Sequence, residues 1–147
     1  MEFSEFSEIE LAGIFNDNLV DLLDQLNAIV ISLTEQNIID KRSKANLDFY
    51  KNLINRAMGL SKEIVIEGFG SYILKEPGFM EKILERDETY FISYNFTENE
   101  TDKNLEELVN IIKSVITFLN DSNKSIIFDY LNILCQTTVT YAHKKYK

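Results

Sequence analysis

The sequence predicts an all-α fold, a compact single-domain bundle of five or six helices. Apolar residues recur at three- and four-residue intervals through two long segments, 14–34 and 105–119. This spacing places the apolar residues on one face of an α-helix. The chain holds a single proline, Pro77, and five glycines among 147 residues, so few positions interrupt a helix. A chain of this length can bury one core, and we expect residues 1–147 to form a single helical domain.

The first helix is expected to begin after Ser7 and to end near Glu35. Ser7 and Glu10 have the spacing of a capping box, in which each side chain accepts a hydrogen bond from the other residue's backbone N–H. An apolar stripe typical of a helix follows, formed by Phe15, Leu19, Leu22, Leu26, Ile29, Val30 and Leu33. The polar residues 36–42 predict a connection.

The next two helices are expected on either side of Gly59. A stripe of Leu47, Tyr50, Ile54, Ala57 and Met58 predicts the second helix, with Gly59 as its C′ residue. Ser61 is then expected to cap a third helix, whose stripe is Ile64, Val65, Phe69, Tyr72 and Ile73. Gly68 and Gly70 would each cost that helix about 1 kcal/mol relative to alanine. The sequence therefore leaves open whether residues 63–74 are helix or strand.

The second half of the chain predicts three further helices. Pro77 suits a first helical turn, so a short fourth helix is expected from Pro77 to Arg86, and Thr89 to Thr101 is expected to be mostly loop. The clearest stripe predicts the fifth helix, with Leu105, Leu108, Val109, Ile112, Val115, Ile116 and Leu119. Residues 120–122 supply a turn and an N-cap for a sixth helix that ends in basic residues 143–145.

The charge of the chain limits its partners. A formal net charge of −9 opposes attraction to nucleic acids and anionic membranes, which are polyanionic surfaces. We therefore expect a protein partner or self-assembly, with no direct nucleic-acid binding and no membrane association. No apolar stretch approaches the eighteen or so residues that span a bilayer, and the acidic start MEFSEFSEIE does not resemble a signal peptide. The expected location is intracellular and cytoplasmic.

No residue pattern predicts an enzyme, a cofactor, a metal or a small-molecule substrate. Asp17, Asp21 and Asp24 would lie along one side of the first helix, as ligands of a hard cation can, but carboxylates at this spacing more often form a solvated face. His143 and Cys135 are the chain's lone histidine and lone cysteine. We expect His143 to complement a helix C-terminus and Cys135 to pack as a free thiol.

A glycine-containing segment resembles a nucleic-acid-binding family. The residues IEGFGSY at 66–72 resemble the GFG-S/T-F segment of the HU/IHF family of DNA-bending proteins. In that family the segment leads into a strand and a basic arm that enters the minor groove. Here no basic arm follows, so the sequence favours a chance match unless residues 63–74 form a β-hairpin.

Four aromatic residues within seven positions form the candidate binding segment. Asp87 and the rings that follow it are the candidate partner-binding residues: Asp87, Tyr90, Phe91, Tyr94 and Phe96. Aromatic anchors ringed by polar residues dominate many interfaces. The alternative is a helix C-terminus whose rings fold back onto the core, since large apolar rings are usually buried.

The same segment carries a family resemblance. ILERDETYF at 83–91 resembles an I-L-x-R/K-D-E-x-F-F motif of small uncharacterised helical proteins encoded by large double-stranded DNA viruses. FNDNLVDLL at 15–23 and IFDYLNIL at 127–134 look similar to that group's first and last helices. The resemblance implies an all-helical fold and a viral origin, hence a location in the host cytoplasm or the virion. It implies no activity.

Together these observations predict a non-enzymatic interaction protein that binds a protein partner through a helix face or the aromatic loop. Two alternatives stay open. One is a structural or assembly component of a virion, and the other is an acidic mimic of nucleic acid, which would occupy a basic groove by presenting carboxylates.

Overall fold

The computed structural model describes residues 3–74, 78–93 and 103–146, and the prediction of an all-α fold is confirmed: no strand occurs among these residues. They form seven α-helices, at least one more than expected, and a short 3-10 helix. The elements are η1 (Phe3–Glu5), α1 (Glu8–Glu35), α2 (Lys41–Leu60), α3 (Ile64–Ile73), α4 (Phe79–Leu84), α5 (Glu88–Ser93), α6 (Lys103–Ile116) and α7 (Asp121–Lys145).

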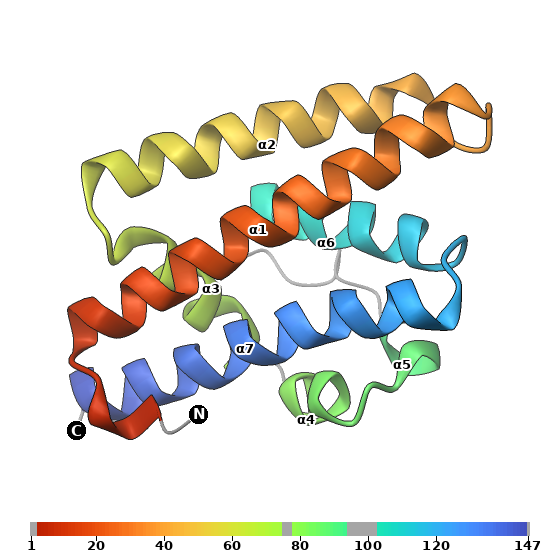
Figure 1. Cartoon of the computed structure of the whole chain (residues 1–147). Helices are drawn as coiled ribbons and strands as arrows, with labels where there is room; N and C mark the ends of the chain where they lie inside the picture. Colours follow the sequence, from red (N-terminus) through yellow and green to blue (C-terminus); the bar gives the residue numbers. More distant parts are fainter. Residues whose placement is uncertain (1–2, 75–77, 94–102, 147) are drawn as a thin grey trace.

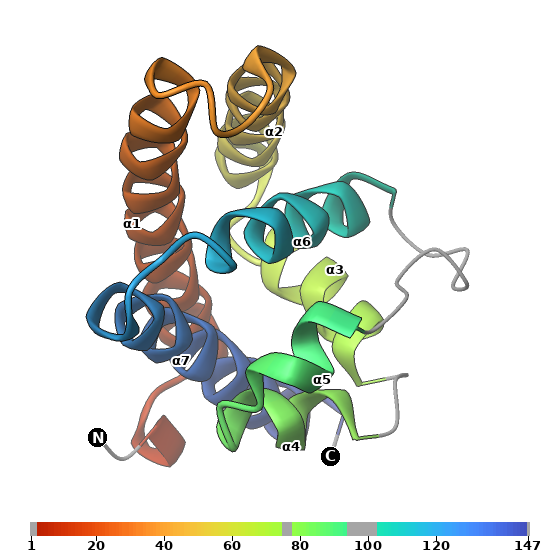
Figure 2. The same ribbon diagram turned by 90° about the vertical axis from the view of Figure 1, so that its right-hand side faces the viewer.

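The two longest helices, α1 and α7, form the centre of the fold. Helix α1 lies between α2 and α7, while α3, α4, α5 and α6 pack along the remaining sides (Figures 1 and 2). The predicted stripe of α1 is buried, with Phe15, Leu22 and Leu26 at most 1% exposed. In α6 the described part of the predicted stripe is also buried, at Ile112, Val115 and Ile116. These side chains belong to one continuous apolar core.

Two predicted helix starts are confirmed by their caps. Ser7 and Glu10 form the expected capping box, with both backbone-to-side-chain hydrogen bonds at 3.1 Å. Asn120 caps α7, because its side chain accepts a hydrogen bond of 2.8 Å from the backbone N–H of Asn123. Both caps satisfy donors that the first helical turn would otherwise leave unpaired.

The predicted end of the second helix is wrong. Helix α2 continues through Gly59, because the N–H of Ser61 still donates to the carbonyl of Ala57 at 3.1 Å. Ser61 is the C-cap of α2 and not the N-cap of α3. Its side chain accepts a hydrogen bond of 3.3 Å from the N–H of Glu63, and α3 begins without a side-chain cap.

Residues 64–73 are helical despite their two glycines. A Cβ atom at Gly70 would lie 3.1 Å from Cγ2 of Thr138, so the glycine permits the close approach of α3 to α7. A Cβ atom at Gly68 would meet nothing within 4 Å. The segment that resembles the HU/IHF family therefore does not form the strand which that resemblance would require.

The region predicted as a fourth helix and a loop contains two short helices. Helix α4 starts at Phe79 after Gly78, whose φ of 80° favours glycine, while Pro77 lies outside the described residues. The expected loop from Thr89 is wrong at its beginning, because α5 occupies Glu88–Ser93. The side chain of Asp87 starts this helix by accepting a hydrogen bond of 3.0 Å from the N–H of Tyr90.

Candidate partner-binding surfaces

The predicted binding residues that the structure describes lie at the corner between α4 and α5. Asp87 caps α5 and lies 3.7 Å from Nζ of Lys82. The ring of Tyr90 packs partly buried against the core, with Nζ of Lys82 at 5.8 Å from its centroid. Both residues therefore have structural contacts in the monomer. Phe91 belongs to α5.

Tyr94 and Phe96 lie outside the described residues, so the structure does not test whether the five predicted residues form one surface. A partner role for them stays a prediction. Arg86, with φ of 58°, ties the same corner to α7. Its guanidinium donates to the backbone carbonyl and the hydroxyl of Ser125, both at 3.1 Å, and to the carboxylate of Asp129. The motif at 83–91 thus supplies a helix junction.

A second feature is an open groove of about 270 Å³ between α3 and the end of α7. Leu74 and Tyr146 stand at its edges, 48% and 73% exposed. Its lining is mostly apolar and comprises Ile66, Glu67, Gly70, Ser71, Leu74, Thr138, Tyr141, Ala142 and Tyr146.

A polar cluster at the groove joins α3 to α7. The hydroxyl of Tyr141 lies 2.7 Å from Oε1 of Glu63 and 2.9 Å from Oε1 of Glu67, so its proton is shared between two carboxylates. Nζ of Lys145 donates to Oε1 of Glu67 at 2.6 Å and to the Tyr141 oxygen at 3.2 Å. The sequence does not predict this cluster. Its only local signal is that Glu63 and Glu67, and likewise Tyr141 and Lys145, have the four-residue spacing of helical neighbours.

The electrostatics of the cluster favour a structural clamp over a reactive group. Burial and then the carboxylate of Glu63 raise the pKa of Tyr141 above its ordinary value, so the hydroxyl stays protonated at neutral pH. The hydrogen bond from Lys145, followed by that from Tyr141, lowers the pKa of Glu67. A protonated tyrosine between carboxylates donates a hydrogen bond and does not act as a base.

The third feature is the outer face of α2, defined here by Arg42, Phe49 and Arg56. These residues are seven positions apart and share one side of the helix, and all three are exposed. Leu47 is buried on the other side, toward the core. Tyr50 is also buried, and its ring meets the ring of Phe49 edge-on, with the two centroids 5.5 Å apart. Phe49 is 56% exposed.

The lone cysteine and the lone histidine lie where the sequence predicts them. Cys135 is buried and free, and burial raises the pKa of its thiol to about 12, so it is not a nucleophile at neutral pH. His143 is exposed near the end of α7. Within residues 3–74, 78–93 and 103–146, no group of His, Cys, Asp or Glu has a metal-binding arrangement. None of the helices in these ranges is long and apolar enough to span a membrane.

No protein-family model, curated protein or solved structure matches the chain. The candidate surfaces therefore rest on the geometry of this chain alone.

Proposed function

We propose that the protein is a non-enzymatic interaction protein that binds another protein through the outer face of α2. The observation that carries this proposal is the exposure of Phe49, a residue that is 56% accessible to water and lies between two arginines on the same side of α2. Aromatic residues and arginine are enriched at interfaces and among the residues that dominate their energy. Covering a phenylalanine ring removes apolar surface from water and stabilises a complex by about 25 cal/mol per Å².

The remaining chemistry supports binding over catalysis. The groove between α3 and α7 has a volume of about 270 Å³, slightly below the range of roughly 300–1,000 Å³ that small-molecule sites usually have. The hydroxyl of Tyr141, which lines this groove, and the buried thiol of Cys135 both stay protonated at neutral pH, because their pKa values are raised. Neither group is prepared to abstract a proton or attack a substrate.

The test uses a photo-crosslinking phenylalanine analogue at position 49. Phe118 offers a matched control position, because it is 51% exposed in the turn between α6 and α7. We expect the analogue at position 49 to crosslink a protein from the source cells and the analogue at position 118 not to do so. The partner is then identified and its affinity measured.

The affinity measurement decides whether the captured protein is a true partner. Phe49→Ser is expected to weaken its binding more than about fivefold, since an aromatic anchor contributes over about 1 kcal/mol. The same change should alter unfolding stability by less than about 0.5 kcal/mol, as exposed substitutions usually do. Phe118→Ser should leave the affinity unchanged. Wild-type affinity in Phe49→Ser would contradict the proposal.

A further inference from the structure

Helices α1 and α2 are neighbours of opposite charge. They run antiparallel and side by side, and no other labelled helix lies over their outer side in either view (Figures 1 and 2). Over 28 residues α1 carries six Asp or Glu residues and no Lys or Arg. Over 20 residues α2 carries five Lys or Arg residues and one Asp. A chain with a net charge of −9 thus concentrates positive charge on one helix.

Each helix presents an exposed stripe with seven-residue spacing. On α2 the stripe is Arg42, Phe49 and Arg56, and on α1 it is Asp21, Ala28 and Glu35, all exposed. The stripe on α2 consists of a basic, an aromatic and a basic residue, and the stripe on α1 consists of an acidic, a small and an acidic residue. In both, the charged ends are fourteen residues or about 21 Å apart.

The charged ends of these stripes have no ion-pair partner among the residues that the structure describes. These ends are Asp21 and Glu35 on α1 and Arg42 and Arg56 on α2. Lys51 of α2 pairs with Asp24 of α1 at 3.1 Å, so these two residues lie at similar heights along the two helices. Counted from that pair along the two antiparallel helices, Asp21 lies near the height of Arg56, Ala28 near that of Phe49, and Glu35 near that of Arg42. In each case the two heights differ by about two residues, or roughly 3 Å.

We infer that the occupant of the outer face of α2 is the α1 helix of a second copy of this chain. This inference rests on the proposed function and names the partner of that surface. Pairing α2 with α2 would place arginine against arginine, and pairing α1 with α1 would place carboxylate against carboxylate. Pairing α2 with α1 brings opposite charges together, which lowers the electrostatic energy of the contact.

Two-fold symmetry makes this contact self-complementary. A two-fold axis parallel to the hairpin keeps every residue at its own height and exchanges α1 with α2 across the interface. Asp21, Ala28 and Glu35 of one copy then face Arg56, Phe49 and Arg42 of the other, and the contact occurs twice. Such an isologous interface closes as a dimer. Ala28 leaves room for the ring of Phe49 between two ion pairs.

The test is a charge exchange measured by sedimentation velocity over about 5–500 µM protein. We expect the wild type to dimerise. The double variant Arg42→Glu/Arg56→Glu and the double variant Asp21→Lys/Glu35→Lys should each sediment as monomers, because the dissociation constant of the dimer rises at least about tenfold. An equimolar mixture of the two variants should restore dimers, because both contacts then pair opposite charges. Phe49→Ser should also sediment as a monomer. Far-ultraviolet circular dichroism of each variant establishes that it is folded.

The control and the contradicting results are specific. Lys62→Glu/Lys144→Glu reverses two exposed charges that lie outside α1 and α2 and should dimerise like the wild type. A wild type that is monomeric throughout, or a mixture that forms no dimer, overturns the inference. If the wild type is monomeric but the analogue at position 49 crosslinks another protein in a Phe49-dependent manner, the proposed function stands while self-association is rejected.

Discussion

Tyr141→Phe tests whether the cluster between α3 and α7 stabilises the fold. Tyr141 is 2% exposed, so the substitution removes one oxygen atom and keeps the ring in place. The lost hydroxyl lies 2.7 Å from Glu63, 2.9 Å from Glu67 and 3.2 Å from Lys145. All three partners are charged, and hydrogen bonds to charged groups are the stronger ones.

The expected loss is about 1–2 kcal/mol of unfolding free energy. A hydrogen bond to a charged group contributes about 1.5–3 kcal/mol. The side chains of Glu67 and Lys145 are 38% and 33% exposed, so water can replace the hydroxyl there and the loss falls toward the lower end. For a chain of this size, the loss corresponds to a decrease in Tm of roughly 2–8 °C.

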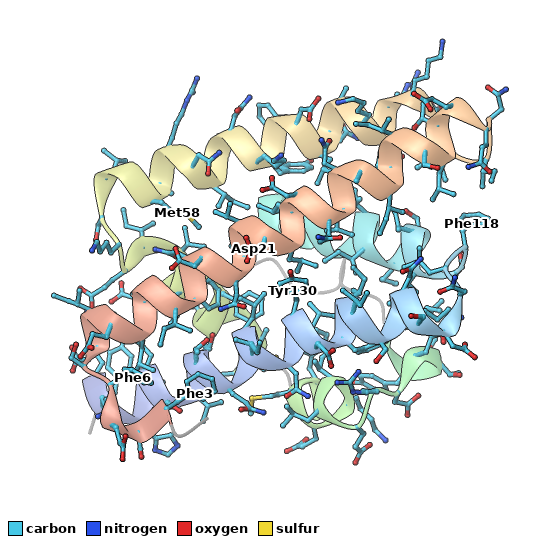
Figure 3. All side chains as sticks on the ribbon, viewed as in Figure 1. Phe3, Phe6, Asp21, Met58, Phe118 and Tyr130 are labelled. Carbon is cyan, nitrogen blue, oxygen red and sulfur yellow. The ribbon has the colours of Figure 1, made fainter. Side chains whose placement is uncertain are left out.

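The assay is thermal unfolding followed by circular dichroism, with Tyr130→Phe as a matched control. Tyr130 also lies on α7 and is partly buried, but its hydroxyl makes no hydrogen bond with the described residues, so its Tm should change little. Figure 3 labels its position. Equal Tm values for Tyr141→Phe, Tyr130→Phe and wild type would refute the view that this cluster joins the helices.

The difference in Tm between Tyr141→Phe and the wild type should depend on pH, and the direction follows from the pKa of Glu67. The pKa of Glu67 is lowered in the folded state from an ordinary value of 4.5, first by Lys145 and then by Tyr141. A lowered carboxyl pKa stabilises the fold above the unfolded-state pKa, and this stabilisation is lost as the pH falls through the folded-state pKa. The decrease in Tm caused by Tyr141→Phe should therefore have its full size at pH 7 and become smaller below about pH 4.5.

Two further predictions concern packing, and both are measured as unfolding free energies in urea. Gly68→Ala should stabilise the protein by up to about 1 kcal/mol through helix propensity, whereas Gly70→Ala should stabilise it less or destabilise it, because its Cβ would lie 3.1 Å from Cγ2 of Thr138. Equal gains would contradict the close approach of α3 to α7. Ile112→Ala should destabilise by about 2–5 kcal/mol by leaving a cavity, since Ile112 is 3% exposed; an unchanged urea midpoint would place it outside the core.

The sequence predicted the long helices because their signals are local. The capping box at Ser7 and Glu10, the stripe of α1 and the cap of α7 at Asn120 depend on residues within a few positions of one another. The sequence does not predict helix α5, because Asp87 and the aromatic residues after it suit both a binding loop and the C-terminus of the preceding helix, whereas in the structure Asp87 caps a new helix. Gly59 was misassigned as a helix end, since a glycine also occurs inside helices that tertiary packing stabilises.

The tertiary structure alone decided which surfaces are candidates for binding. The exposure of Phe49 depends on which side of α2 faces the core, whereas the aromatic pattern of the sequence indicates residues 87–96 as the binding segment. In the cluster around Tyr141, this residue contacts Glu67, which is 74 positions earlier in the chain, and Glu63, which is 78 positions earlier. No local sequence pattern predicts a contact between residues so far apart in the chain. The sequence determines that the segment of α1 is acidic and that the segment of α2 is basic. Only the folded chain places these two helices side by side and antiparallel, because packing determines which of their faces remain in water.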